Sequence, residues 1–277
     1  MLKLFTNSQL DTQFKTNGYC VVENLLPQQT VKLVEETFFR LADNAGLDIP
    51  FSTTHWSSND LYRQEVHHSV TEAVFPLITR LLPDYKNIFG YYLVKKQGGE
   101  NKTTIHQDWT LCDESIYTGM TLWSPLTNVN LQNGCFQVVK GSHLFYANIR
   151  GTNIESPYSN FGNFIEEKYL TSLELKKGDA VFFDHRLLHA SPPNISDNIR
   201  IAVGMVLLPQ QAEVEHYIKE EETIYRYQCD DKFLLSSHYN HKNPEKAIFD
   251  KSKYKLIESK SFLEYQTNFQ EFTKHIQ

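Results

Sequence analysis

The sequence predicts a mainly β domain, a jelly roll with helices packed outside it. From about residue 86 onward, short apolar runs rich in β-branched and aromatic residues are separated by turn signals, among them Gly98-Gly99 and Asn133-Gly134. Many short strands at such spacing are typical of a sandwich or barrel and not of an alternating α/β fold. The 277 residues contain no internal repeat and no low-complexity linker, so we predict one domain over residues 1–277.

The N-terminal region, residues 7–85, is predicted to supply the helices that cover the sheet. Residues 7–17 are expected to form a short helix that ends at Gly18, and the β-rich run 19–22 follows as a strand. Pro27 opens a second helix, whose apolar stripe indicates that one face lies on a sheet. The stripe consists of Val31, Val34, Phe38 and Leu41, and Gly46 is expected to end the helix.

A polar segment then separates this helix from a third one. Residues 47–66 are rich in Ser, Thr and Asn without a periodic pattern, so we predict a long loop there. Long loops are often functional, and we expect this one to approach the mouth of a site with Trp56 as a candidate contact, although surface packing of Trp56 fits equally well. A helix is predicted over residues 71–82, with Pro76 bending it or setting its start.

The predicted core spans about residues 86–210, and residues 211–277 form a C-terminal extension. Strands are expected at residues 88–94, 103–110, 119–126, 135–139, 172–175, 180–183 and 200–208. Residues 144–171 break the pattern and are predicted to be an insertion over one end of the barrel, where specificity could reside. After residue 209 the chain is charged and irregular until a final amphipathic helix, which is expected to pack on the barrel and not on a second subunit. Its apolar residues are Phe262, Tyr265, Phe269, Phe272 and Ile276.

Composition excludes several classes of protein. The formal net charge is -6 and the pI is about 6.0, so the chain lacks the basic surface that nucleic-acid and membrane-surface proteins need. No run of 18 apolar residues exists, and the N-terminus has no apolar signal core. The four cysteines are far apart, which disfavours a zinc cluster and a disulfide framework. We therefore expect a cytoplasmic protein that binds a small molecule, of unpredicted oligomeric state.

A candidate metal site begins at His106-Gln107-Asp108. Residues two apart on a strand share a face, so His106 and Asp108 could both turn toward one ion. Two imidazoles and one carboxylate leave three coordination positions open, which is the arrangement of non-haem Fe(II) oxygenases. By itself this pair fits better a solvated strand residue beside a hydrogen-bonded core histidine. The metal interpretation therefore requires a second histidine.

Four histidines could supply that ligand, namely His143, His185, His189 and His216. His189 directly follows the predicted strand 180–183 and its turn, which suits a strand that closes beside the first pair. His185 and His189 are also four residues apart, the spacing of a zinc-binding pair on a helix. Pro192-Pro193 and the preceding β pattern disfavour a helix there. We therefore predict His189 as the third ligand.

A candidate anion site lies shortly after His189. Arg200 is the first residue of the predicted apolar strand 200–208. An arginine at this position usually lies at the solvent-exposed end of the strand. Near a metal, however, its guanidinium would offer a two-pronged hydrogen-bond donor to a carboxylate, as a bound 2-oxo diacid needs. Ser191 could donate to the same carboxylate. Lys95, Lys96 and Gln97 could reach the cofactor from the preceding strand, but exposed lysines are the expected interpretation.

Taken together, these residues resemble the phytanoyl-CoA dioxygenase family of Fe(II)/2-oxoglutarate oxygenases over about residues 10–210. The resemblance rests on His106-x-Asp108, Asn133-Gly134-Cys135, Gly141-Ser142-His143, His189-x-Ser191, Pro193-Asn194 and Arg200. It implies a cupin-like double-stranded β-helix in which His106, Asp108 and His189 are the catalytic iron ligands. It also implies that Arg200 and Ser191 hold the distal carboxylate of 2-oxoglutarate and that Trp123 lines the cofactor pocket. The chain departs from the family at Lys140. Family members have a proline at this position, directly before Gly-Ser-His, and the difference affects none of the implied metal ligands.

The resemblance also implies a reaction. Dioxygen would oxidise 2-oxoglutarate to succinate and CO2 while an unactivated C–H bond of the substrate is hydroxylated. Asp108 fills the position that related halogenases leave open, so hydroxylation is expected instead of halogenation, with desaturation and cyclisation left open. No basic cluster awaits a coenzyme A phosphate, and we expect a small metabolite or natural-product intermediate as substrate. The candidate substrate residues are Trp109, Thr110 and Tyr117, with Tyr158, Asn160 and Phe161 from the insertion.

Two other functions stay open at this point. One is a cupin-type metalloprotein, a hydrolase or isomerase that does not use 2-oxoglutarate. The other is a non-catalytic ligand-binding barrel in which His106 and Asp108 are structural. The first would have no use for Arg200 with Ser191, and the second would tolerate loss of a ligand, yet all three candidate ligands are present.

Overall fold

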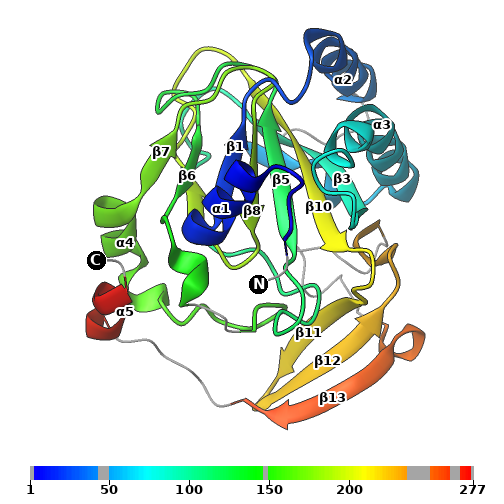
Figure 1. Cartoon of the computed structure of the whole chain (residues 1–277), viewed down its shortest axis with the longest axis vertical. Coiled ribbons are helices and arrows are strands. Elements are labelled where there is room, and N and C mark those ends of the chain that lie inside the picture. The colour runs from blue at the N-terminus through cyan, green and yellow to red at the C-terminus, as the bar shows by residue number, and fades with distance from the viewer. Residues whose placement is uncertain (1–2, 43–49, 146–148, 236–249, 263–268, 276–277) are drawn as a thin grey trace.

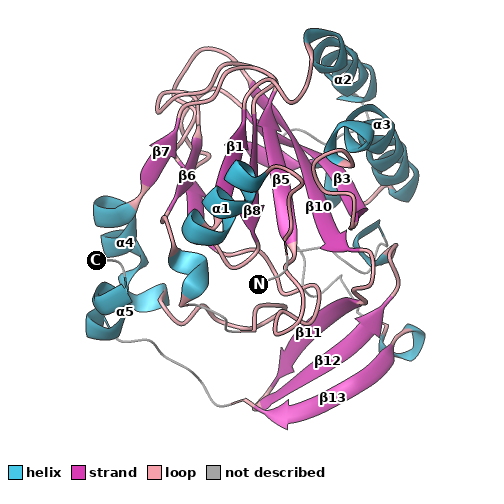
Figure 2. Cartoon of the chain, in the orientation of Figure 1, coloured by secondary structure: helices cyan, strands magenta, loops and turns pink. Residues whose placement is uncertain are grey.

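The chain folds into two facing β-sheets with helices on the outer side of the larger one (Figures 1 and 2). This computed structural model describes residues 3–42, 50–145, 149–235, 250–262 and 269–275. The mainly β jelly roll with flanking helices that the sequence predicts is confirmed. No helix among these residues has both the length and the apolar character that a membrane crossing requires.

The larger sheet is antiparallel and has the strand order β1-β8-β5-β10-β3-β2. Neighbours in this order are far apart in the sequence, as a jelly roll requires. Its strands are β1 (Tyr19–Val22), β2 (Phe51–Thr53), β3 (Tyr85–Lys95), β5 (Met120–Pro125), β8 (Ala180–Asp184) and β10 (Arg200–Pro209). Strand β10 pairs with β3 so that Arg200 lies opposite Lys95.

The smaller sheet has the order β4-β9-β6-β7. Its strands are short: β4 (Thr103–His106), β6 (Phe136–Val138), β7 (Thr171–Leu173) and β9 (His189–Ser191). Strand β9 was not predicted as a strand, because three residues are too few to show a period of two. Its pairing with β4 places His106 opposite His189, so the two histidines come together as the sequence predicts.

Alternation along the large sheet separates two layers of core. On the inner face, Trp123, Val181 and Ala202 pack with residues of the small sheet such as Phe136. On the outer face, alternate residues of the same strands pack against the helices, among them Leu122, Phe182, Val203 and Met205. Because both faces are covered, β8 and β10 are apolar along almost their whole length and buried throughout except at Pro209.

Three N-terminal helices form the outer layer: α1 (Ser8–Asn17), α2 (Gln28–Leu41) and α3 (Asp60–Ile78). Helix α1 ends at Gly18 with φ of 81°, a left-handed conformation that glycine adopts without strain. The predicted stripe of α2 is buried as expected, whereas Gly46 lies outside the described residues. Helix α3 begins at Asp60 and not at residue 71, because Asn59 caps it by accepting a hydrogen bond from the Tyr62 backbone N–H (3.1 Å).

The prediction of a structureless loop over residues 47–66 is wrong for its described part. Strand β2 joins the edge of the large sheet beside β3, and Thr54–Trp56 form a 3-10 turn. Thr53 and Thr54 are buried although they are polar. Their hydroxyls are hydrogen-bonded: that of Thr54 accepts from the Tyr92 backbone N–H at 3.0 Å, and that of Thr53 bonds His55 Nδ1. Polar composition therefore hid a buried edge strand.

The insertion carries the short helix α4 (Gly162–Tyr169), and the chain's last described element is α5 (Phe269–His275). Phe272 of α5 is fully buried with Val139 and Leu188 of the core and stacks edge-on against Tyr169. The C-terminal helix thus packs on its own chain, as predicted, beside α4 (Figure 1). Tyr265 and Ile276 of the predicted stripe lie outside the described residues.

The prediction of an irregular segment after residue 209 is also wrong. Strands β11 (Val214–Glu220), β12 (Thr223–Cys229) and β13 (Lys255–Ser261) form a separate antiparallel sheet, seen below the two main sheets in Figure 1. Its charges pair within the sheet: Glu215 is buried, bonds Arg226, and accepts from the Tyr217 hydroxyl at 2.7 Å. Strand β13 is exposed along its whole length. Charged side chains therefore masked the alternation that identifies strands.

Candidate metal centre and its cavity

Strands β4 and β9 and the loop after β4 bring the three predicted metal ligands together. The ligand atoms of His106, Asp108 and His189 all lie within 4.8 Å of one another. His189 Nε2 is 3.7 Å from Asp108 Oδ1, and the two imidazole centroids are 4.1 Å apart. The predicted strand over 103–110 is too long, however, because β4 ends at His106. Asp108 thus reaches the centre from a loop and not from the alternation of a strand.

Both imidazoles are held in one orientation by backbone carbonyls. His106 Nδ1 lies 2.8 Å from the Thr104 carbonyl oxygen, and His189 Nδ1 lies 2.9 Å from the Leu187 carbonyl oxygen. A carbonyl can only accept a hydrogen bond, so each Nδ1 carries a proton, and in the neutral ring it is Nε2 that keeps a lone pair. Burial and the neighbouring His106 lower the pKa of His189 to about 4, so this ring is neutral near pH 7. Both rings are therefore prepared to ligate a metal.

The Asp108 carboxylate is fixed by the opposite sheet. The Thr121 hydroxyl, on β5, donates to Asp108 Oδ2 at 2.7 Å. Burial opposes ionisation of Asp108, yet the surrounding histidines and this hydroxyl hold its pKa below its ordinary value. Asp108 therefore supplies a charged oxygen ligand. Because Thr121 shares a strand face with Trp123, the predicted alternation of 119–126 could have identified it.

Arg150 holds the backbone of the Asp108 loop from behind. Its Nε donates to the Asp108 carbonyl oxygen at 2.7 Å, and its two terminal nitrogens donate to both carboxylate oxygens of Glu114 at 2.9 and 2.5 Å. The Arg150 backbone N–H also donates to the Thr110 hydroxyl, and the Thr110 N–H to the Arg150 carbonyl oxygen. Both members of the ion pair are nearly buried. Sequence reasoning missed this contact because Arg150 lies 42 residues from Asp108.

The guanidinium of Arg200, the candidate group for binding an anion, lines another part of the same cavity. Arg200 is 2% exposed, and its Nε has no hydrogen-bond partner in the described chain. Its Nη1 donates to the Leu93 carbonyl oxygen at 3.3 Å, and the guanidinium lies 5.6 Å from the Trp123 ring centroid. Burial lowers the pKa of Arg200 to about 9, so the group is still cationic near pH 7. A buried guanidinium without a carboxylate partner is costly, and a bound dicarboxylate such as 2-oxoglutarate would satisfy it.

This end of the cavity includes Ser191, which is supported by Lys95, a residue outside the lining. Ser191 lines it and donates its hydroxyl to the Gly134 carbonyl oxygen at 3.0 Å. Lys95 is fully buried, which corrects the expectation of an exposed lysine. Its Nζ donates to the carbonyl oxygens of Ser191 (3.1 Å) and Pro192 (2.7 Å), while burial and the charge of Arg200 lower its pKa to about 6. Lys95 therefore supports the segment that carries Ser191.

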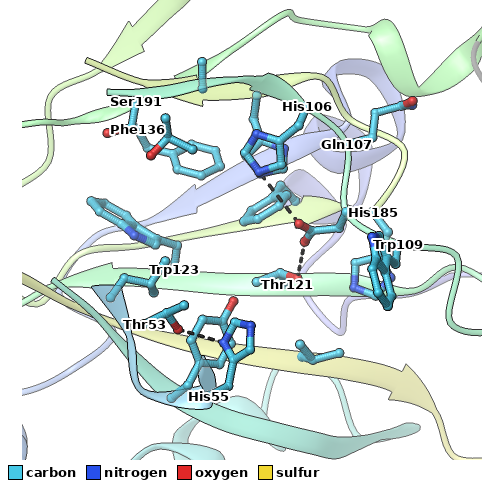
Figure 3. A pocket seen from close by; sticks show the side chains of 18 of the residues that line it. Thr53, His55, His106, Gln107, Trp109, Thr121, Trp123, Phe136, His185 and Ser191 are labelled. Carbon is cyan, nitrogen blue, oxygen red and sulfur yellow. Dashed lines mark hydrogen bonds and ion pairs between the residues drawn. The ribbon is translucent and has the colours of Figure 1, made fainter. Parts of the chain in front are cut away.

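The cavity between the sheets has a volume of about 510 Å³. Figure 3 shows Ser191 and Trp123 toward one side of it, Trp109 and His185 toward the other, and Thr53 and His55 below. Away from Arg200 the wall is largely aromatic, made by Phe51, Trp56, Phe89, Tyr91, Trp109 and Leu234. A glycine makes room for one of these rings: a Cβ atom on Gly204 would lie 2.4 Å from Tyr91 Cζ. The predicted approach of residues 47–66 to the site mouth, with Trp56, agrees with this lining.

Of the predicted substrate residues, Trp109 lines the cavity, whereas Thr110 and Tyr117 do not. Thr110 is turned away because its hydroxyl accepts from Arg150, and Tyr117 belongs to a turn that packs beside the small C-terminal sheet. The insertion does not contribute to the lining either in its described part. It lies behind β4, where Glu166 accepts a hydrogen bond from the Ile105 backbone N–H (2.7 Å) and the Tyr158 hydroxyl donates to Gln107 (3.2 Å).

The sequence is similar to a known enzyme family. A profile of the family described as phytanoyl-CoA dioxygenase (PhyH) matches residues 14–202, more than half of the chain. A Dictyostelium discoideum protein named phytanoyl-CoA dioxygenase domain-containing protein 1 homolog is 30% identical over 165 residues, which cover 56% of this chain and 58% of that protein. The human peroxisomal phytanoyl-CoA dioxygenase is 21% identical over 222 residues, covering 69% of this chain and 65% of that protein. The matches thus span less than two thirds of either relative.

Solved structures share the fold. The non-haem α-ketoglutarate-dependent carbocyclase SnoK from nogalamycin biosynthesis matches with a TM-score of 0.58 and 20% identity, over 75% of this chain and 86% of that one. HygX from Streptomyces hygroscopicus, solved with nickel and 2-oxoglutarate bound, matches with a TM-score of 0.56 and 12% identity, over 74% of this chain and 88% of that one. At these identities the likeness establishes the jelly-roll fold alone.

Proposed function

Because the chain belongs to the phytanoyl-CoA dioxygenase family, we propose that it hydroxylates an unactivated C–H bond of a small metabolite or natural-product intermediate. The family and the fold place it among the iron- and 2-oxoglutarate-dependent oxygenases. The observation that carries the proposal is the convergence of His106, Asp108 and His189 on one cavity with the buried, carboxylate-free Arg200. Succinate and CO2 would be the co-products.

The cofactors are iron(II) and 2-oxoglutarate, with dioxygen as co-substrate. When bound, they supply an oxidant strong enough to attack an unactivated C–H bond. In the proposal, Nε2 of His106, Nε2 of His189 and the Asp108 carboxylate hold the iron. Arg200 receives the distal carboxylate of 2-oxoglutarate, which its unpaired Nε supports, while Ser191 and Trp123 border that end of the cofactor. The aromatic wall excludes water from the reacting atoms.

Hydroxylation is the finer part of the proposal. Asp108 is present and charged, so the coordination position that a halide would need is filled. Structures with this fold include an enzyme named as a carbocyclase and one named as an epimerase, so the fold itself does not select the outcome. A hydrolase or isomerase without 2-oxoglutarate would leave the buried charge of Arg200 uncompensated, and we do not favour it.

The substrate class differs from that in the family's name. Apart from Arg200, Lys102 is the only cationic side chain among the described lining residues, and it bonds Glu166. A coenzyme A thioester carries several phosphate charges and would need a cluster of such groups. We therefore propose a substrate without the coenzyme A moiety.

Anaerobic spectroscopy tests the proposal. Iron(II) and 2-oxoglutarate added together should give the weak visible charge-transfer band of the metal chelate, and His189→Ala should abolish it. Admission of oxygen with a panel of small molecules should then release succinate above the rate without substrate. Folded, iron-loaded protein that gives no band would overturn the proposal. A band without substrate-stimulated succinate would show that the panel lacks the substrate, and the cofactor assignment would stand.

A further inference from the structure

His185 is a buried imidazole that no described residue satisfies. It follows β8, is fully buried, and lines the cavity that holds the three candidate metal ligands. Neither Nδ1 nor Nε2 has a hydrogen-bond partner among the residues that the structure describes. It is not among the residues whose ligand atoms converge on the metal position. An unsatisfied buried polar group is costly, so a cavity occupant that bonds this ring would recover a favourable interaction.

The ring is held in place by Gly119. The His185 backbone N–H donates to the Gly119 carbonyl oxygen at 3.1 Å. A Cβ atom built on Gly119 would lie 2.5 Å from His185 Nδ1 and 2.9 Å from Cε1, so this edge of the ring rests on the glycine. The Nε2 atom is left as the nitrogen turned away from that contact. Burial lowers the pKa of His185, so the ring is neutral near pH 7 and offers one donor and one acceptor.

Several other polar groups in this half of the cavity already have partners. The Thr53 hydroxyl and His55 Nδ1 are 2.7 Å apart, and the Thr121 hydroxyl is used by Asp108. The Gln107 amide bonds the Arg186 carbonyl oxygen and the Tyr158 hydroxyl. Figure 3 shows His185 and Trp109 on the opposite side of the view from Ser191 and Trp123. His185 is therefore placed to meet the substrate and not 2-oxoglutarate.

The wall around His185 carries little charge. Among the described lining residues the charged ones are Lys102, Asp108 and Arg200. Lys102 bonds Glu166, Asp108 takes part in the candidate metal centre, and Arg200 lies beside Trp123 at the proposed cofactor end. The remainder is dominated by aromatic rings such as Trp56, Phe89 and Tyr91. Such a wall favours flat, apolar surface, and it offers no counter-ion to a charged substrate.

We propose that His185 is a specificity-determining residue that hydrogen-bonds a neutral oxygen or nitrogen group of an uncharged, ring-bearing substrate. This inference rests on the proposed function, because it names the substrate class of the same site. The aromatic wall holds the ring system, and His185 selects and orients its polar group near the metal.

Equilibrium dialysis with four matched probes tests the inference. The protein is loaded with 2-oxoglutarate and nickel(II) in place of iron, so that no turnover occurs. The probes are naphthol, naphthalene, naphthoate and a trimethylnaphthylammonium ion, which share a ring system and differ in the polar group. Naphthol should bind about threefold to tenfold more tightly than naphthalene, the effect of one hydrogen bond to a buried partner, and both ions should bind more weakly than naphthol.

Variants separate hydrogen bonding from packing. His185→Leu should make the affinities for naphthol and naphthalene equal, and His185→Gln should restore part of the preference. Because leucine removes two unsatisfied nitrogens, His185→Leu should melt no lower than the natural protein. A His185→Leu protein that loses affinity for both probes equally would show a packing role and overturn the assignment. Tightest binding of naphthoate or of the ammonium ion would overturn the uncharged substrate class.

The two proposals can fail separately. Dialysis detects probe binding without turnover, whereas the chelate band and succinate release report the oxygenase chemistry. If the probes show the His185-dependent preference and the iron chelate band is absent, the proposed function fails while the binding site stands. If the band forms but naphthol and naphthalene bind equally, only the role of His185 is overturned.

Discussion

Residues of the candidate metal centre act in pairs, in which one group is a proposed ligand and a second fixes its direction. The Thr104 and Leu187 carbonyls set the tautomers of His106 and His189, and Thr121 orients Asp108. Such supporting contacts commonly affect metal affinity by tenfold or more. The convergence of the three candidate ligands was predictable from local spacing and one distant histidine. Their supports were not, because each depends on which strands become neighbours.

Replacing Arg200 by alanine should separate the two cofactors. We expect roughly tenfold to hundredfold weaker 2-oxoglutarate binding, because a hydrogen bond to a charged group contributes about 1.5–3 kcal/mol. Iron(II) binding should change little, since Arg200 is not among the converging ligand atoms. Titration of the chelate band measures the first affinity, and competition with a coloured chelator the second. Arg200→Lys keeps the charge and loses the planar guanidinium, so its affinity for 2-oxoglutarate should lie between those of the natural protein and Arg200→Ala. Equal loss of affinity for both cofactors in Arg200→Ala would contradict the role of Arg200.

Replacing Lys95 by methionine should change how stability depends on pH. The pKa of Lys95 is about 6 in the folded protein, through burial and the charge of Arg200, against the ordinary 10.5. Between these values the unfolded chain binds more protons, so Lys95 makes the folded protein more stable as the pH rises from about 6 to about 10. The stability of Lys95→Met relative to the natural protein should therefore be highest near pH 6 and decline toward higher pH.

Urea unfolding at several pH values measures this trend. Lys95→Met also loses two hydrogen bonds to the Ser191 and Pro192 carbonyls, which shifts the difference by an amount that does not depend on pH. The slope with pH is therefore the test, and not the sign. Lys140→Met, at an exposed lysine, is the control. A difference for Lys95→Met that stays constant across the range would refute the lowered pKa.

Elements differ in how well their sequences reveal them. The strands of the large sheet other than the edge strand β2 were predictable because both faces are buried and apolar runs result, as in β8 and β10. Strand β9 is too short for a pattern, and the charged residues of β11 and β12 find partners that are distant in the sequence or on another strand, as Glu215 does with Arg226. Burial of charge in pairs is a tertiary property, so local polarity gave the wrong prediction there.

The loop that carries Asp108 should depend on Arg150. Arg150→Ala removes the donor to the Asp108 carbonyl and leaves the buried Glu114 without its partner. We expect iron(II) affinity to fall about tenfold, since the loop that presents the carboxylate gains freedom. Chelator competition measures this affinity. Arg226→Ala is the matched control, because it breaks a similar pair with Glu215 but has no bond to Asp108. Equal effects of both variants on iron affinity would indicate general destabilisation.

The whole molecule joins its two sheets at the site. Both candidate histidine ligands stand on the small sheet, Asp108 follows it, and Arg200 stands on the large one. The jelly roll itself was predictable from strand spacing. The closure of the cavity by Phe51, Trp56 and Leu234 was not, because these residues come from an edge strand, a turn and a C-terminal segment that meet only in the folded chain.

This arrangement predicts that 2-oxoglutarate stabilises the protein only together with the metal. Held by iron on the small sheet and by Arg200 on the large one, it would tie the sheets to each other. A ligand at a hundred times its dissociation constant adds about 2.7 kcal/mol. For a chain of this size that corresponds to a melting temperature about 5–10 °C higher. Thermal melts are recorded with nickel(II), with 2-oxoglutarate, and with both. The rise in melting temperature with both together should exceed the sum of the two separate rises. Arg200→Ala should keep the metal shift and lose about half of this excess or more, because its affinity for 2-oxoglutarate is tenfold to hundredfold lower. An excess that survives undiminished in Arg200→Ala would mean that 2-oxoglutarate does not bridge the sheets.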